Sequence, residues 1–239
     1  MTRCRQPPQR KRMRTTRTID APEWDLIFRE ISNHPPVASY RASVNVLAEK
    51  PLGSDPFYVL IATIISLRTR DEVTLPAAER LLARGGSPAA MLLLSPDQIE
   101  TLIYPAGFYR TKARTILEVS RILQEQYGGT VPSTGDALTA LPGVGLKTAN
   151  LVLALGFGID AICVDTHVHR VANRMGWVHT TNPDRTTTAL EEILPRKYWI
   201  PINHWMVAFG RTVCTPGRPL CSRCPVQKKC GQVGVTRPR

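Results

Sequence analysis

The chain has 239 residues, of which 43% are hydrophobic, and its formal net charge is +12. This length predicts one or two domains with a core of ordinary size. The longest uncharged apolar run, residues 58–67, is far shorter than the roughly 18 residues needed to cross a bilayer, which excludes a membrane-spanning protein. Seven basic residues lie in residues 1–19 and seven more in residues 210–239, with no acidic residue in either segment, so we expect a polyanionic partner.

Residues 1–19 are rich in Arg, Pro, Gln and Thr and have almost no apolar side chain to bury, which predicts a disordered basic tail. The tail lacks the apolar segment of a secretory signal. It could be an organellar transit peptide, a nuclear address at residues 10–12, or an arm that holds nucleic acid, and these alternatives stay open.

The first ordered element is predicted at Asp20, a helix N-cap residue with a proline in the first turn and Glu23 at the capping-box position. An apolar helix face follows, formed by Trp24, Ile27, Phe28 and Ile31. Further helices are predicted at residues 57–67, 76–83, 88–94, 96–103 and 112–127. The first of these is rich in β-branched residues, but no neighbouring segment offers an alternating partner or a hairpin turn. The predicted fold class is therefore all-α.

Residues 133–157 predict a helix-hairpin-helix, with a short helix at 137–141, a tight turn at 142–145 and a second, mostly apolar helix at 146–157. Free N–H groups at the turn and at the start of the second helix can bind a phosphate without reading a base. An ordinary corner between two helices is the alternative, which the full string Leu-Pro-Gly-Val-Gly-x-Lys-Thr-Ala disfavours. The candidate DNA-binding residues of this motif are Leu141, Gly143, Val144 and Gly145.

Two residues in and after this motif are candidates for catalysis. Lys147 lies in the first turn of the second helix, where the positive end of the helix dipole disfavours a cation and favours the neutral amine that can attack carbon. The alternative is a solvated lysine that binds phosphate. Asp165 follows an apolar run at 161–164 and begins another predicted helix at 166–175, so its simplest role is that of an N-cap.

Four of the six cysteines lie within seventeen residues, with six, two and five residues between successive members: Cys214, Cys221, Cys224 and Cys230. Such crowding predicts a metal site rather than disulfides. Structural zinc is one alternative, but zinc sites usually carry two close cysteine pairs and this segment has one. Thiolates also suit iron and sulfide. The basic residues between the cysteines predict a cationic surface that binds phosphate: Arg218, Arg223, Lys228 and Lys229.

From about Trp24 to Cys230 the sequence resembles the endonuclease III branch of the helix-hairpin-helix DNA glycosylases. The strings that carry the resemblance are Leu141-Pro-Gly-Val-Gly-x-Lys147-Thr-Ala-Asn150, Val164-Asp-Thr-His-x-x-Arg170-Val, Gly107-Phe-Tyr-x-x-Lys112-Ala and His204-Trp205. The resemblance implies that Lys147 attacks C1′ of a damaged nucleotide, that Asp165 assists it, and that an imine then permits β-elimination. It also implies that the four clustered cysteines hold a four-iron four-sulfur (4Fe-4S) cluster.

The resemblance further implies two helical domains with DNA in the cleft between them. Residues 49–159 would form a six-helix barrel that contains the hairpin, and residues 20–48 and 160–239 would form the iron-sulfur cluster domain. The implied partner is double-stranded DNA with damaged bases or abasic sites, bound by a monomer. The implied compartment is the cytoplasm (nucleoid) in a bacterium or archaeon, and the nucleus or mitochondrion in a eukaryote.

The chain departs from the family pattern at one string. The family usually has Ser-x-Gln-x-Thr-Asp, whose Gln fills the gap left by an extruded base, and this chain has Arg68 and Arg70 at the Gln and Thr positions. Arg68 offers only donors, so we expect a preference for an estranged guanine, whose O6 and N7 are acceptors. The alternative is that both arginines contact phosphates. Phe108 falls where the family places an apolar wedge, although it could belong to the core.

The implied activity is that of a bifunctional DNA glycosylase and AP lyase, which removes oxidised pyrimidines in base excision repair and cleaves 3′ to the abasic site. A monofunctional glycosylase for mismatched adenine or thymine is the first alternative, but it would usually lack a lysine at position 147. A non-catalytic helix-hairpin-helix protein that only binds DNA is the second alternative. It would not need Lys147 and Asp165 together at these places.

Overall fold

The computed structural model describes residues 21–41, 44 and 55–239. Over these residues the chain is helical and contains no strand, which confirms the all-α prediction. The longer helices are α1 (Ala21–Ser32), α4 (Pro56–Ser66), α5 (Asp71–Leu82), α7 (Pro96–Ile103), α8 (Tyr109–Gln126), α10 (Leu146–Gly156), α11 (Thr166–Met175), α12 (Pro183–Ile193) and α13 (Ile202–Thr212). The short ones are α2 (Pro35–Ala38), α6 (Pro88–Met91), α9 (Gly135–Thr139), η1 (Arg196–Tyr198), η2 (Cys221–Arg223) and η3 (Gln227–Lys229).

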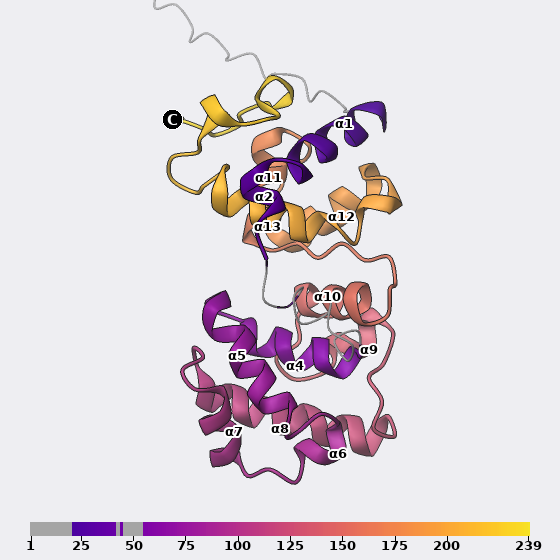
Figure 1. Cartoon of the computed structure of the whole chain (residues 1–239). Coiled ribbons are helices and arrows are strands. Elements are labelled where there is room, and N and C mark those ends of the chain that lie inside the picture. The colour runs from indigo at the N-terminus through magenta and orange to yellow at the C-terminus, as the bar shows by residue number, and fades with distance from the viewer. Residues whose placement is uncertain (1–20, 42–43, 45–54) are drawn as a thin grey trace, which may run out of the picture.

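The helices from α4 to α10 pack around one hydrophobic core in the lower half of Figure 1. Helix α4 is the centre of this core, because eight of its residues are buried, and it packs along α10. The Asp55 side chain accepts a hydrogen bond from the Phe57 N–H and so caps the start of α4. Burial on nearly every side explains why a segment rich in β-branched residues is helical, since tertiary packing outweighs helix propensity.

A second hydrophobic core joins α1 and α2 to α11, α12 and α13, which lie together in the upper half of Figure 1. Trp24, Phe28 and Trp177 stack at its centre, with ring centroids 4.9 to 5.8 Å apart. The segment that carries the four clustered cysteines packs against the same core. The start of the described chain and its C-terminal third therefore share one core, while the middle of the chain has its own.

Two polar contacts connect the two halves near α5. Arg211 of α13 lies 3.0 Å from the Asp71 carboxylate of α5, and the Tyr40 hydroxyl donates to the same carboxylate at 2.7 Å. The Arg211 guanidinium also lies over the Tyr40 ring. Burial and the Asp71 carboxylate raise the pKa of Tyr40, so its hydroxyl keeps the proton that it donates.

Several predicted helix limits were wrong. Helix α5 begins at Asp71 rather than residue 76, because two acids favour its first turn through the helix dipole, and Pro76 lies inside the helix at the cost of one hydrogen bond. Helix α6 ends at Met91 rather than residue 94, and α8 begins at Tyr109 rather than residue 112. Asp20, the predicted first N-cap, the basic tail at 1–19 and Cys4 lie outside the described residues.

Candidate active site

A cleft of about 530 Å³ opens between the start of α10 and the start of α11. Its wall brings together four of the predicted site residues, Lys147, Asp165, Arg68 and Gly145. The remaining lining residues are Leu146, Val164, Thr166, His167, Pro183, Asp184 and Arg211. The side chains that could perform covalent chemistry thus lie on one solvent-accessible cavity, large enough to hold a nucleotide-sized group.

Lys147 lies in the first turn of α10, directly after the hairpin turn. The N-cap residue of α10 is Gly145, which supplies no side-chain hydrogen bond, so the first N–H groups of the helix are not capped by a side chain. Free N–H groups and the positive end of the dipole favour an anion here and disfavour a cation. The start of α10 is therefore suited to bind a phosphate, and Lys147 lies beside it.

Asp165 is the N-cap of α11, which is the structural role that its position predicted. The N–H groups of His167 and Val168 donate to its side chain at 2.8 and 2.9 Å, and both donate to the same oxygen, Oδ1. These two bonds fix the position of the carboxylate. Because they use one oxygen, the cap is compatible with a second role for Oδ2 in the cleft.

The segment that precedes Asp165 is held by two buried asparagines, one on the helix that carries Lys147 and one on α13. Asn150 of α10 donates from Nδ2 to the Ile162 carbonyl at 2.9 Å. Asn203 of α13 donates to the Cys163 carbonyl at 3.1 Å from the other side. Since both amides are buried, these bonds constrain the separation of Lys147 and Asp165. Cys163 itself is buried, and burial raises the pKa of its thiol to about 12.

Among the cleft residues without a predicted role, three have ionisable side chains: His167, Asp184 and Arg211. Burial lowers the pKa of His167, while the neighbouring Asp165 carboxylate acts in the opposite direction. His167 could have been found from the sequence, because it lies in the first turn of the helix that Asp165 caps. Asp184 and Arg211 come from α12 and α13, and no sequence pattern connects those helices to the hairpin.

The hairpin turn exposes glycines and buries its apolar side chains. Gly143 has a φ of +75°, and a side chain there would meet a methyl group of Thr115 at 2.9 Å. Gly145 has open space around it and is exposed. Leu141 and Val144 are buried, so any contact of these two with DNA must come from their backbone. The turn therefore offers main-chain groups and little side-chain bulk to an approaching phosphate.

Arg68 and Phe108 lie side by side at the mouth of the cleft, although 40 residues separate them in the sequence. The Arg68 guanidinium is over the Phe108 ring, 5.6 Å from its centroid. Phe108 is 62% exposed, so it is a surface residue and not part of the core. Arg70 is exposed as well and precedes the first turn of α5, but it does not line the cleft.

The four clustered cysteines line the wall of a single small pocket beside the C-terminal ends of α11 and α13: Cys214, Cys221, Cys224 and Cys230. None of them forms a disulfide. Burial raises the pKa of Cys224 to about 11. Two N–H groups point at sulfur, from Arg174 to Cys214 and from the Gln232 backbone to Cys230. In the described part of the chain no three His, Cys, Asp or Glu side chains are arranged to hold a single metal ion.

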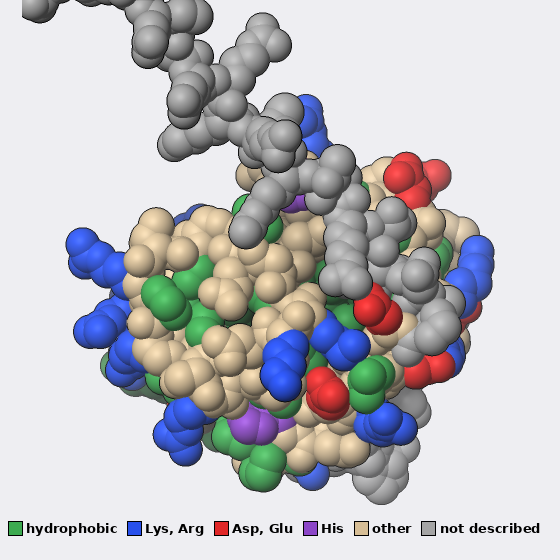
Figure 2. All heavy atoms as spheres, turned by 90° about the horizontal axis from the view of Figure 1, so that it is seen from above, with side chains coloured by type: hydrophobic (Ala, Val, Ile, Leu, Met, Phe, Trp, Pro, Cys, Tyr) green, Lys and Arg blue, Asp and Glu red, His purple; other side chains and the backbone are tan. Residues whose placement is uncertain are grey.

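The basic residues between the cysteines lie at the surface. Arg218, Arg223 and Lys228 are exposed and Lys229 is half-buried. Figure 2 shows Lys and Arg side chains projecting along the edge of the molecule where the C-terminal segment lies. In the described ranges, no helix has the length and apolar character needed to cross a membrane.

Comparisons of sequence place the chain near DNA repair proteins. The HhH-GPD family, a superfamily of base excision DNA repair proteins, matches residues 61–196. Endonuclease III of Thermotoga maritima is 49% identical over 177 residues, which cover 74% of this chain and 83% of that protein. Endonuclease III-like protein 1 of Bos taurus is 44% identical over 171 residues, and the match covers 70% of this chain and 56% of that longer protein.

Solved structures have the same fold. A trapped covalent intermediate of endonuclease III with DNA, in a complex with an estranged adenine, matches with a TM-score of 0.77 and 30% sequence identity. The match covers 90% of this chain and 97% of that chain. A non-covalent endonuclease III–DNA complex gives the same values. A thermostable thymine-DNA glycosylase matches with a TM-score of 0.76 at 24% identity, which is a likeness of fold alone.

Proposed function

Because the chain belongs to the endonuclease III family of HhH-GPD base excision DNA repair proteins, we propose that Lys147 and Asp165 are its catalytic nucleophile and carboxylate. The chain is a bifunctional DNA glycosylase and AP lyase, and its substrates are double-stranded DNA with oxidised pyrimidines or abasic sites. The observation that carries the assignment of residues is the cleft of about 530 Å³ that both side chains line.

The reaction begins when a damaged nucleotide leaves the duplex, at a cost of a few kcal/mol that is smallest for a poorly paired base. As the bond from C1′ to the base breaks, the base takes the electron pair and positive charge develops on the sugar. The fixed Asp165 carboxylate stabilises this charge more than it stabilises the neutral substrate, which lowers the barrier. The Lys147 amine forms the new bond to C1′, and the sugar ring opens to a protonated imine.

The imine makes a proton on C2′ acidic. Loss of that proton expels the 3′ phosphate as the leaving group, which is the β-elimination step of an AP lyase. Lys147 is essential to this route, because a water molecule in its place would release the base and leave the strand intact. Neither a monofunctional mismatch glycosylase nor a non-catalytic binding protein would need Lys147 and Asp165 on one cleft, so both alternatives are poorly supported.

We place DNA along the surface that holds the hairpin, the mouth of the cleft and the basic C-terminal segment. The hairpin glycines Gly143 and Gly145 offer main-chain N–H groups to phosphate. Leu141 and Val144 would shape the turn, because their own N–H groups donate to the carbonyls of Leu138 and Leu141. Arg68 and Phe108 would lie against the duplex opening, and Arg70 would contact phosphate. Between the cysteines the phosphate contacts would come from Arg218, Arg223, Lys228 and Lys229.

The two hydrophobic cores support the proposed domain division. The core of α4 to α10 comes from the segment 49–159 that we assign to the six-helix barrel, except for Val44, Ala161 and Cys163 beside its ends. The core of α1, α2 and α11 to α13 joins the segments 20–48 and 160–239 that we assign to the cluster domain. The cleft then lies where the two domains meet, because Lys147 comes from the first and Asp165 from the second.

The four thiols that line one pocket fit a 4Fe-4S cluster, since each would bind a different iron at the wall of a shared cavity. The cluster would be a structural centre there, holding the segment 214–230 in place. Arg174 and the Gln232 N–H would donate to ligand sulfurs, an arrangement that tunes such clusters.

Replacing Cys224 by alanine is expected to abolish the visible absorption of the purified protein and to make residues 214–239 sensitive to protease. The segment contains only short 3₁₀ turns, so without the cluster only its contacts with the second core and with Arg170 and Arg174 would hold it in place. Cys163→Ala is the matched control, because Cys163 is buried but lies outside the pocket, and it should keep the full absorption. Stoichiometric zinc and a colourless wild-type protein would contradict the assignment of iron and sulfide.

The proposed activity is tested by borohydride reduction of the wild-type protein mixed with duplex DNA that contains one abasic site. Borohydride reduces an imine to a stable amine, so we expect a one-to-one covalent adduct that undamaged duplex does not give. Without borohydride the same duplex should be cleaved 3′ to the abasic site. A folded, coloured protein that releases damaged bases but forms no adduct would contradict the lyase assignment.

A further inference from the structure

Lys112 is a buried lysine whose contacts connect the two loops at the mouth of the cleft. Its side chain is 6% exposed, and its Nζ donates to the carbonyl oxygens of Ile65 and Leu67 at 2.6 Å each and to Thr69 Oγ1 at 2.8 Å. All three partners are neutral oxygens. Burial lowers the pKa of Lys112 to about 8, whereas an acceptor for each of the three N–H bonds of an ammonium favours the charged form.

The partners of Lys112 belong to the loop that carries Arg68. Ile65 and Leu67 lie at the C-terminal end of α4, where carbonyl groups lack helical partners and the dipole is negative. Between Leu67 and Thr69 lies Arg68, whose φ is +53°, a left-handed conformation that is uncommon for a residue with a side chain. Lys112 therefore holds the Leu67 backbone on one side of a strained residue and the Thr69 side chain on the other.

The second loop is fixed through the same hydroxyl. The Gly107 N–H donates to Thr69 Oγ1 at 3.1 Å, so Thr69 connects Lys112 to the loop that carries Phe108. Phe108 also has a left-handed backbone, with a φ of +58°. The two loops touch closely at Gly107, where a Cβ atom would lie 2.5 Å from the Arg68 carbonyl oxygen. Only glycine permits this approach.

Arg68 and Phe108 therefore form an exposed pair. Their backbone is strained at both residues and is held in place by the hydrogen bonds of Lys112 and Thr69. An aromatic ring with a guanidinium over it suits insertion into a base stack, because the ring stacks on bases and the cation contacts base edges or phosphates. A protein that must separate base pairs gains from a unit ordered before binding, since less conformational entropy is lost on contact with DNA.

We propose that Lys112 is a positioning residue that holds Arg68 and Phe108 as a preformed unit for opening the duplex. This inference rests on the proposed function, because it concerns how the damaged nucleotide reaches the cleft. Lys112 itself is buried and acts only through the two loops. A merely structural role, in which Lys112 caps the end of α4, would affect all functions of the protein alike.

The direct test uses a duplex with an uncleavable abasic analogue opposite 2-aminopurine, whose fluorescence rises when it is unstacked. At saturating wild-type protein we expect a clear rise, because Arg68 and Phe108 displace the opposite base. Lys112→Met keeps the length of the side chain and removes the three hydrogen bonds, and it should lose most of the rise at saturation. The measurement needs no chemistry, so it is independent of Lys147.

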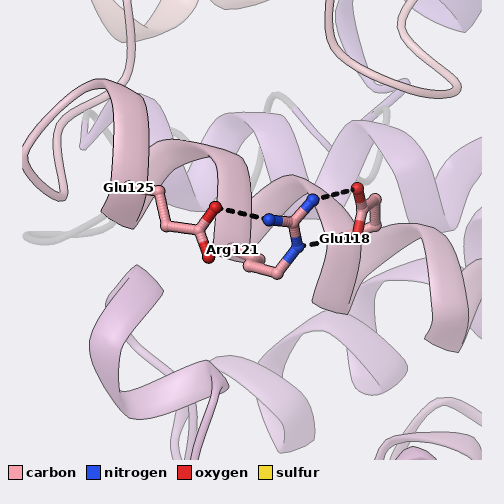
Figure 3. Close-up of polar contacts among 3 residues, drawn as sticks. All are labelled: Glu118, Arg121 and Glu125. Atoms are coloured by element: carbon pink, nitrogen blue, oxygen red, sulfur yellow. Dashed lines mark hydrogen bonds and ion pairs between the residues drawn. The ribbon is translucent and has the colours of Figure 1, made fainter.

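The matched control is Arg121→Met, which removes a cation from the same helix α8. Arg121 is a surface residue that pairs with Glu118 and Glu125 (Figure 3), away from both loops. This variant should give the wild-type fluorescence rise. On a duplex with a true abasic site, Lys112→Met should lower kcat/KM for cleavage by about a hundredfold, the usual effect of a displacement of about 1 Å. Its borohydride adduct with a single-stranded abasic site should persist.

A wild-type fluorescence rise in Lys112→Met would overturn the inference, as would an equal loss of adduct on single-stranded and duplex DNA. If Lys112→Met does not fold, Thr69→Val decides, because valine keeps the shape of threonine and removes the hydroxyl that connects the loops. A full rise in that variant would then overturn the inference. If the wild type shows the rise but forms no adduct, the proposed function fails and the positioning role stands.

Discussion

Replacing Lys147 by alanine is expected to abolish the borohydride adduct and to lower the rate of strand cleavage at an abasic site by at least about 10³-fold. The reason is chemical, since the imine that activates the C2′ proton cannot form without the amine. The fold should be kept, because Lys147 is half-buried and its removal takes a cation away from the positive end of α10. The free energy of unfolding should therefore change little, as measured by urea denaturation.

The Lys147→Arg variant tests whether Lys147 acts as a nucleophile or only as a positive charge. Arginine keeps a cation near the hairpin phosphate site but stays protonated and cannot form an imine. If Lys147 served only to bind phosphate, the arginine variant would retain most of the activity while the alanine variant would not. We expect both variants to lose the adduct, and the arginine variant to bind abasic duplex with nearly the wild-type affinity.

The sequence predicted the parts of this site that depend on local signals. Helix α11 has the predicted limits, because Asp165 begins it and Gly176, with a φ of +81°, ends it. Helix α10 follows the hairpin turn as predicted and ends one residue earlier. Both catalytic candidates lie at helix starts, where capping and turn residues leave a clear pattern in the sequence.

The contacts that hold the site in shape could not be predicted, because they join residues far apart in the chain. Lys112 contacts Ile65 across 47 residues, and Asn203 contacts Cys163 across 40. Helix α12 was missed although Asn182, whose side chain caps the Arg185 N–H, stands before a proline in the first turn. Asn182 followed by proline was thus a local signal for the start of α12. The packing of α12 and α13 beside the cleft, in contrast, leaves no pattern in the sequence.

Asp165→Asn is expected to lower kcat for release of a damaged base by about 10² to 10³-fold. An amide at the same place cannot stabilise positive charge on the sugar as a carboxylate does. Asparagine is as good an N-cap as aspartate, so the bonds from His167 and Val168 to Oδ1 should persist. Loss of the charge at the N-terminus of α11 should then cost at most about 1 kcal/mol in the free energy of unfolding.

Asp165→Ala is the comparison that separates the two roles, because it removes both the charge and the cap. It should lose activity to the same extent as Asp165→Asn and, in addition, about 1 kcal/mol of stability from the lost cap. If the asparagine variant kept full activity while the alanine variant lost both activity and stability, Asp165 would be only a cap. Because both N–H bonds use Oδ1, we expect the opposite result, in which the asparagine variant is stable and nearly inactive.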